Sequence, residues 1–202
     1  MRRETIHDEI MLGVLDAVEA DPAVSQRGMA KQLGIALGLA NSYVKHCAKK
    51  GLIKVQQAPA RRYAYYLTPH GLTEKSRLTA SYLAHSFAFF RRARAQFGEV
   101  FTIAAGLGQN RLALLGDGDL TEIARLVSLE KGVKVVGTVT LSDLVTLQRD
   151  LCALGEIDAI VVTTLDDPRE AYRCAIELFG KDRVHVPELL RVHARRSVEG
   201  AP

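Results

Sequence analysis

Residues 25–68 read SQRGMAKQLGIALGLANSYVKHCAKKGLIKVQQAPARRYAYYLT, and their pattern is sufficient to predict the fold of the first half of the chain. Ser25 predicts the start of a short helix, because its hydroxyl can accept from the unpaired amides of the first helical turn. Gly34 is expected to end that helix. A second helix is predicted to start near Ala36 and to end at Gly51. The stretch therefore predicts two short helices joined by a tight turn.

The second helix has two faces of different character. Ala40, Val44 and Cys47 recur at i, i+4 and i+7, which predicts one buried stripe. The opposite face carries small, amide-bearing or cationic residues: Leu37, Gly38, Asn41, Ser42 and Lys45. Such a face suits a DNA major groove, where Asn pairs with adenine and Lys with guanine or phosphate. We therefore expect the second helix to contact DNA bases.

Two strands are predicted after the second helix, at residues 52–55 and 63–67, from their β-branched and aromatic content. The loop between them, residues 56–62, contains two adjacent arginines and predicts a basic β-wing. Outside the second helix, the predicted DNA contacts are Ser25, Gln26, Arg27, Arg61, Arg62 and Tyr63.

Helix, turn, helix and basic wing together resemble the winged-helix regulators of the MarR type. The resemblance is closest to the subgroup linked to exopolysaccharide genes, whose segment reads SQRxLAKxLGISLGxxNxxLKxLxxKG and continues into a strand, a wing and YxYxLTPxG. The matching pieces here are Ser25-Gln26-Arg27, Ala30-Lys31, Leu33-Gly34-Ile35, Leu37-Gly38, Asn41, Lys50-Gly51 and Tyr66-Leu67-Thr68-Pro69-His70-Gly71.

This resemblance covers residues 5–80 and implies a double-stranded DNA partner. Two positions depart from the subgroup's pattern. Gly28 replaces the acid that would complete a capping box, and Ala36 replaces the usual serine N-cap, so looser helix starts are expected. The alternative is a winged helix that serves only protein contacts. The wing and the outward face of the second helix are both basic, which favours DNA.

Charge divides the 202-residue chain into two halves. Residues 1–98 carry a net charge of +8 and residues 99–202 a net charge of −4, which predicts two domains with different partners. No apolar run is long enough for a membrane span, and the first residues lack a signal-peptide core. Cys47, Cys152 and Cys174 are odd in number and widely spaced, which favours reduced thiols in a cytoplasmic protein.

Long helices are predicted on both sides of the winged unit. The first covers residues 4–20, with a buried side made of Ile6, Ile10, Val14, Leu15 and Val18. The second runs from residue 72 to about Gly98 and is rich in aromatic residues. Because operators with two half-sites need a two-fold protein, we expect a homodimer through Tyr82, Phe87, Phe90 and Phe97. The alternative is packing of this helix on the chain's own second domain.

The second half alternates apolar strands with helical patterns. Strands are predicted at 111–115, 133–139, 158–163 and 183–186, and helices at 120–130, 141–154 and 169–179. This order predicts a parallel sheet with right-handed crossovers, a small Rossmann-like domain, and α/β as the overall fold class. The predicted divisions are 1–70 for DNA binding, 71–98 for the linking helix, 99–193 for the Rossmann-like domain and 194–202 for a tail.

A glycine turn after the first of these strands lies where dinucleotide folds bind phosphate. The fingerprint is broken, because Thr121 stands where a third glycine would complete it, and Asp117 and Asp119 would repel phosphate. The segment is more similar to the Rossmann-like module of nucleotide-sugar-modifying proteins. The predicted ligand contacts are Gly116, Asp117, Gly118, Asp119, Leu120, Thr121, Thr163 and Thr164. The alternative is a degenerate sheet that serves as a dimer scaffold.

The sequence contains no Ser-His-Asp set, no HExxH and no Tyr-x-x-x-Lys pair, and its six histidines are scattered. It therefore predicts no catalytic or metal-binding residue and identifies no cofactor. The resulting expectation is a transcriptional regulator of surface-polysaccharide genes that responds to a nucleotide or nucleotide-sugar effector. Two alternatives stay open: a redox regulator that senses NAD(H), similar to the Rex family, and an enzyme with a DNA-targeting domain.

Overall fold

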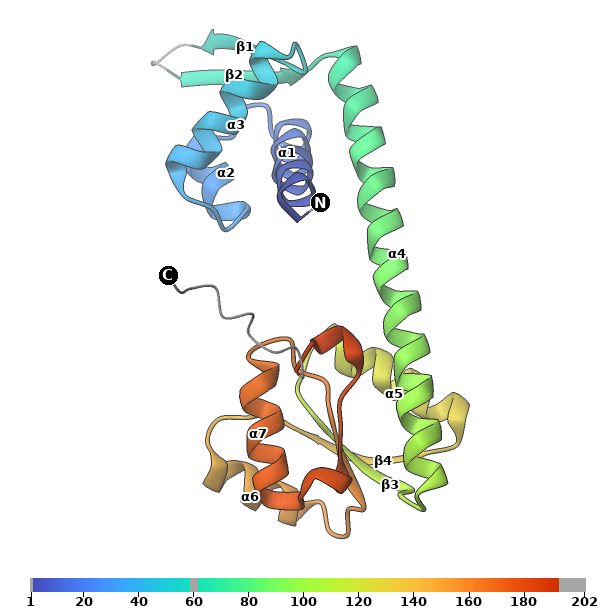
Figure 1. Cartoon of the computed structure of the whole chain (residues 1–202). Coiled ribbons are helices and arrows are strands. Elements are labelled where there is room, and N and C mark those ends of the chain that lie inside the picture. Colours follow the sequence, from blue (N-terminus) through green and yellow to red (C-terminus); the bar gives the residue numbers. More distant parts are fainter. Residues whose placement is uncertain (1, 59–61, 193–202) are drawn as a thin grey trace, which may run out of the picture. The chain divides into compact units, whose positions relative to one another are not determined.

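The computed structural model describes residues 2–58 and 62–192, with side chains at 6–57 and 63–192 (Figure 1). The chain divides into two compact units, residues 1–87 (unit 1) and 88–202 (unit 2). Helix α4, Pro69–Gly106, contributes to both units. No helix in the described ranges combines the length and the hydropathy that spanning a bilayer requires.

Unit 1 is a winged helix-turn-helix. Its elements are α1 (Arg2–Ala20), α2 (Gln26–Gln32), α3 (Leu37–Lys49), β1 (Ile53–Ala58), β2 (Arg62–Leu67) and the first part of α4. The two strands pair antiparallel from Ile53 with Leu67 to Ala58 with Arg62. The predicted order of elements is confirmed. Both strands run further into the wing than predicted, and residues 59–61 at its tip lie outside the described residues.

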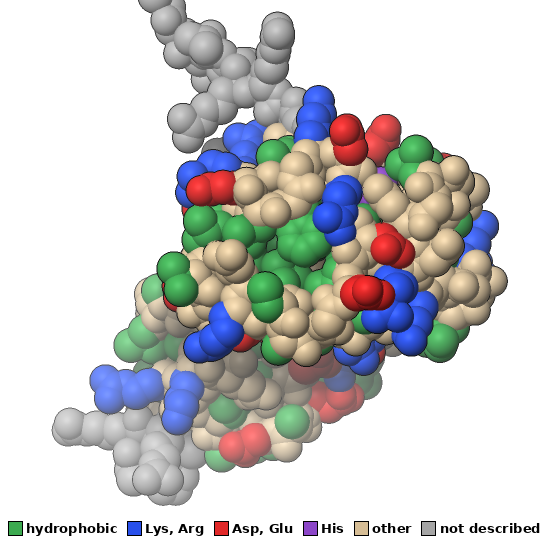
Figure 2. All heavy atoms as spheres, turned by 90° about the horizontal axis from the view of Figure 1, so that it is seen from below, with side chains coloured by type: hydrophobic (Ala, Val, Ile, Leu, Met, Phe, Trp, Pro, Cys, Tyr) green, Lys and Arg blue, Asp and Glu red, His purple; other side chains and the backbone are tan. Residues whose placement is uncertain are grey.

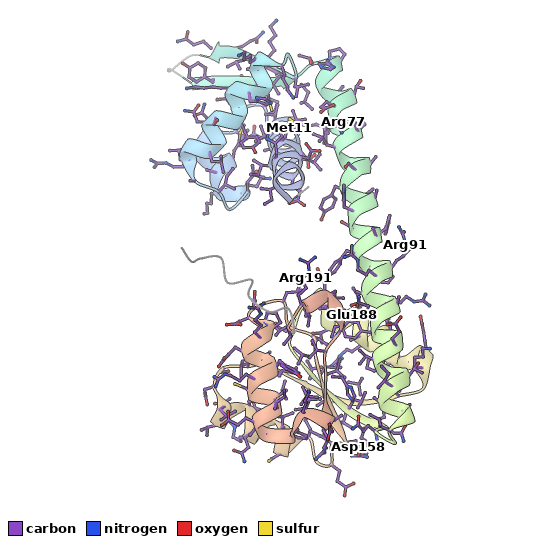
Figure 3. The ribbon with its side chains drawn as sticks, viewed as in Figure 1. Met11, Arg77, Arg91, Asp158, Glu188 and Arg191 are labelled. Atoms are coloured by element: carbon purple, nitrogen blue, oxygen red, sulfur yellow. The ribbon has the colours of Figure 1, made fainter. Side chains whose placement is uncertain are left out.

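The core of unit 1 is formed where α1, α2, α3 and the hairpin meet. Its members include Met11, Val14, Leu15, Val18, Met29, Val44, Cys47, Leu52, Ile53, Tyr65 and Leu78. Figure 3 labels Met11 inside this group of elements. The prediction for Ile6 is wrong, because this side chain is 50% exposed near the start of α1. Met11 fills the core instead.

The Leu-Thr-Pro-x-Gly segment connects the hairpin to α4. The Thr68 hydroxyl donates to the carbonyl of Gly51 at 2.6 Å and accepts from the amide of Gly71 at 3.0 Å. A Cβ added at Gly71 would lie 2.0 Å from the carbonyl oxygen of Leu52, so only glycine fits this approach. The segment therefore fixes the start of α4 against the end of α3.

Helix α4 continues to Gly106, eight residues beyond its predicted end. The extension carries Val100, Phe101 and Ala104, which are buried in the core of unit 2. Phe97 is also fully buried there, and its ring centroid lies 6.1 Å from that of Phe101. The assignment of Phe97 to a dimer surface is therefore wrong, because its side chain stabilises the sheet of its own chain.

Unit 2 is a parallel α/β sheet with the strand order β4-β3-β5-β6. The strands are β3 (Arg111–Leu115), β4 (Lys134–Val139), β5 (Ala159–Val162) and β6 (Val184–His185). The helices are α5 (Asp119–Lys131), α6 (Leu144–Ala153) and α7 (Pro168–Phe179), with short 3-10 turns at Lys181–Arg183 and Glu188–Leu190. Helices α4 and α5 cover one face of the sheet, and α6 and α7 cover the other (Figure 1). The predicted parallel architecture is confirmed.

Candidate nucleic-acid interface

Helix α3 presents the outer face that the sequence predicts. Ala40, Val44 and Cys47 are buried in unit 1, as expected from their spacing. The predicted contact residues on the other side are exposed, with Asn41 half-buried: Leu37, Gly38, Ser42 and Lys45. Ala36, the N-cap, makes no side-chain hydrogen bond. A helix fixed on one side and open on the other is suited to enter a groove.

Helix α2 packs against α3, and its first residues are also predicted DNA contacts. The Ser25 hydroxyl accepts from the amide of Gly28 at 3.0 Å, so the predicted cap is confirmed. Gln26 donates through Nε2 to the hydroxyl of Tyr65 at 3.3 Å, which ties α2 to β2. Arg27 is exposed. Ser25 and Gln26 thus have hydrogen-bond partners within unit 1, and the exposed Arg27 supplies the positive charge at the start of α2.

The wing extends the interface along β2. Tyr63 is 54% exposed and pairs across the hairpin with Gln57, which is also exposed. The sequence analysis did not include Gln57, because it assigned residue 57 to the loop and not to the strand that pairs with Tyr63. Arg61 lies outside the described residues, and the side chain of Arg62 is not described. The predicted basic contacts at the tip of the wing therefore stay predictions.

An open groove of about 680 Å³ separates the start of α2 from the wing strand. It is lined by Asp21, Ala23, Val24, Ser25, Gln26, Gly28, Tyr63 and Tyr65. Three of the predicted DNA contacts, Ser25 and Gln26 at the start of α2 and Tyr63 on β2, thus border a single groove.

Helix α3 is held to α1 by an aromatic cluster. His7 Nδ1 lies 2.9 Å from the hydroxyl of Tyr43, and the rings of His7 and His46 meet edge-on with centroids 5.5 Å apart. Burial lowers the pKa of His46, whose Nε2 has no partner among the described residues. Burial also raises the pKa of the neighbouring Cys47 thiol to about 11, which makes it a core group and not a reactive one.

Unit 2 buries several of its predicted ligand contacts. Leu120, Thr121 and Thr163 are at most 2% exposed, and the two threonine hydroxyls bond each other at 2.8 Å. A Cβ on Gly116, which has φ +140°, would lie 2.4 Å from the amide nitrogen of Thr164. The ends of β3 and β5 are therefore packed together. This corrects the expectation that these side chains line an open crevice.

The accessible part of that rim is acidic. Asp117, Gly118 and Asp119 are exposed at the start of α5, and Asp166 and Asp167 are exposed after β5. Within residues 2–58 and 62–192, no cluster of His, Cys, Asp and Glu is arranged to hold a metal ion. The opposite end of unit 2, seen from below, mixes acidic and basic side chains around a hydrophobic group (Figure 2). Neither end has a uniformly basic surface.

Comparison with known proteins supports the architecture of unit 1. Residues 7–54 match the family of winged helix-turn-helix DNA-binding domains. No curated protein sequence gives a significant match.

Solved structures similar to the chain include the PcaV transcriptional regulator from Streptomyces coelicolor, with 25% identity over 40% of this chain and 59% of that protein and a TM-score of 0.38. MepR, a transcription regulator of the Staphylococcus aureus multidrug efflux pump MepA, shows 18% identity over 40% and 61%, with a TM-score of 0.35. A further MarR family regulator shows 15% identity over 75% and 80%, with a TM-score of 0.38. The chain spans about 60% of the length of the first two. At these TM-scores the likenesses carry no functional argument.

Proposed function

We propose that this chain is a DNA-binding transcriptional regulator of the MarR type that acts on double-stranded DNA as a homodimer. The observation that carries the proposal is helix α3, whose apolar side is buried while its opposite side exposes small and cationic residues around the half-buried Asn41. The match of residues 7–54 to winged helix-turn-helix DNA-binding domains supports it. The sequence resemblance described above supports the MarR type.

In this proposal α3 enters the major groove, with Asn41 and Lys45 directed to base edges. Arg27 and the wing contact the flanking backbone. The net charge of +8 on residues 1–98 supplies the attraction to phosphate, and the acidic second half does not contribute.

The proposal is tested by fluorescence anisotropy with an operator selected from random duplexes. Lys45→Ala should weaken operator binding, because an exposed cation on the reading helix is lost. Lys134→Ala removes an exposed cation from β4 in unit 2 and is the matched control. Equal affinities for the two variants would contradict the assignment of α3.

We further propose that unit 2 responds to a small-molecule effector at the accessible part of its rim, formed by the exposed Asp117, Gly118 and Asp119 and the half-buried Thr164. The carboxylates there favour an uncharged polar or cationic ligand over a nucleotide or nucleotide sugar, since they repel phosphate. Sensing of NAD(H) is the second candidate and has the same difficulty. Thermal-shift titration with nucleotide sugars, NAD(H) and polyols decides between these classes, because a ligand present at 100 times its Kd adds about 2.7 kcal/mol of stability.

Control of surface-polysaccharide genes is the target class that the motif resemblance supports. Chromatin immunoprecipitation of the full chain in its host tests it directly. Enrichment of promoters unrelated to polysaccharide synthesis would remove this part of the proposal and leave DNA binding in place.

A further inference from the structure

Unit 2 contains an open groove of about 650 Å³ between α4 and α5. It is lined by Arg94, Ala95, Gly98, Glu99, Thr102, Ile103, Val127, Glu130 and Lys131. Apolar side chains beside it are left uncovered: Ile103 on α4 is 57% exposed and Leu126 on α5 is 55% exposed. Exposed apolar groups that border a groove are typical of a protein–protein contact.

The α4 side of the groove repeats with the spacing of a helix pair. Residues at intervals of three, four and seven share one face, which is exposed except at the half-buried Gly98: Ala88, Arg91, Ala95, Gly98, Thr102 and Ala105. Ala95 and Gly98 lie at its centre and allow another helix to approach closely. Arg91, labelled in Figure 3, is the one long side chain on this face.

One flank of this face carries charges of both signs, so it is complementary to the same flank of a second copy. Arg92 and Glu99 are seven residues apart on the same flank, both are exposed, and neither has an ion pair among the described residues. Arg94, on the other flank, is bound to Glu130 of α5 at 2.9 Å. In an antiparallel helix pair, residues of one flank face the same flank of the other helix. Arg92 would then lie beside Glu99 of the second copy, and the two-fold axis would repeat that contact.

We infer that a second copy of this chain packs its α4 antiparallel against this groove, centred between Ala95 and Gly98, with two Arg92–Glu99 pairs that fix the register. The inference rests on the homodimer of the proposed function and names its surface. It moves the two-fold contact from the aromatic stretch around Tyr82 and Phe87 to the part of α4 that belongs to unit 2.

Charge reversal tests the inference in the full-length chain by sedimentation equilibrium. Arg92→Glu and Glu99→Arg should each raise the dimer dissociation constant at least tenfold, because each places two like-charged pairs at the contact. The double variant Arg92→Glu/Glu99→Arg should restore the wild-type constant, since the pairs are re-formed with exchanged signs. A purely structural role of either residue would not give this rescue.

Gly98→Leu supplies a second test that does not depend on charge. A Cβ at Gly98 meets only the flexible Lys131 side chain, at 3.5 Å, so the fold of the monomer accommodates the change. The added side chain should fill the groove and give a folded monomer, whose melting temperature falls only by the stabilisation that dimerisation supplied. Gln148→Leu adds the same group at an exposed position of α6, on the other face of the sheet, and should stay dimeric.

A wild-type monomer, a double variant without rescue, or a dimeric Gly98→Leu chain would each overturn the inference. So would a dimer that dissociates with Phe87→Asp but not with Gly98→Leu, which would place the contact on the aromatic stretch. None of these changes touches α3, so all variants should keep affinity for a single half-site. If the wild-type chain did not bind a half-site at all, that result would contradict the proposed function and not the dimer contact.

Discussion

The outer face of α3 in unit 1 and the strand ends of unit 2 carry similar small and polar side chains. Those of α3 are exposed, whereas those of unit 2 are largely buried. Leu37, Ser42 and Lys45 of α3 point into solvent without a described partner. In unit 2, Thr121 in the first turn of α5 and Thr163 directly after β5 form a buried hydrogen bond with each other. Residue type alone therefore does not identify a binding surface. A surface available to a ligand needs polar groups that the fold has left unpaired and accessible.

The largest expected effect is a difference in stability between two leucine variants. Leu120 is a predicted ligand contact in unit 2, and Leu37 is a predicted DNA contact in unit 1. Leu120→Ala should lower the free energy of unfolding of unit 2 by roughly 2–5 kcal/mol, because the side chain is fully buried and its removal leaves a cavity. Leu37→Ala should change stability by less than about 0.5 kcal/mol, since Leu37 is 45% exposed. Urea denaturation of both variants measures the two losses of unfolding free energy. Equal losses would contradict the difference in burial between the two sites.

A second, smaller effect concerns the buried threonine pair. Thr163→Val leaves the Thr121 hydroxyl without its partner and should cost about 1–3 kcal/mol of stability. The double variant Thr121→Val/Thr163→Val should cost less than the sum of the single changes, because no unpaired hydroxyl remains. Additive losses in a double-mutant cycle would mean that the hydroxyls serve separate partners, as an open ligand site would require.

The wing gives the corresponding test in unit 1. Replacing Arg61 and Arg62 with Ala should weaken binding to all DNA sequences and reduce the salt-dependence slope by about 2 for each subunit bound, since each phosphate contact contributes about 0.9. Mobility shifts at several salt concentrations measure the slope. An unchanged slope would exclude the wing from the phosphate contacts and leave α3 as the interface.

The smallest effect concerns pH. Burial lowers the pKa of His46 in unit 1 and of His185 in unit 2, so the folded state disfavours their protonation. Their contribution to stability is complete above the ordinary histidine pKa of about 6.5. It is lost as the pH falls from there toward the lower pKa of the folded state. Melting temperatures of both units should decline over this range, and His46→Gln and His185→Gln should each flatten the decline of its own unit.

Much of the fold follows from local sequence signals. The Ser25 cap, the Gly34 and Gly51 helix ends and the i, i+4, i+7 stripe of α3 all depend on neighbours within one helix, and the structure confirms them. The alternation of strands and helices in unit 2 is equally local. These features need no knowledge of distant contacts.

The errors arise where distant packing decides. Phe97 resembles its exposed aromatic neighbours, but only the position of the sheet shows that it is buried. The end of α4 at Gly106 is set by Phe101 and Ala104 on the same sheet. The Thr121–Thr163 bond joins residues 42 apart, which no local pattern indicates. Ile6 fits the periodicity of α1 and still lies beyond the reach of the core.

The central claim is that α3 reads DNA sequence through its exposed face. Titration of wild type and Asn41→Ala, each against the selected operator and against operators with single base-pair changes, tests it most directly. We expect that Asn41→Ala loses roughly 1–3 kcal/mol of discrimination at one base pair and keeps its affinity for unrelated duplex DNA. Unchanged discrimination at every base pair would contradict the claim.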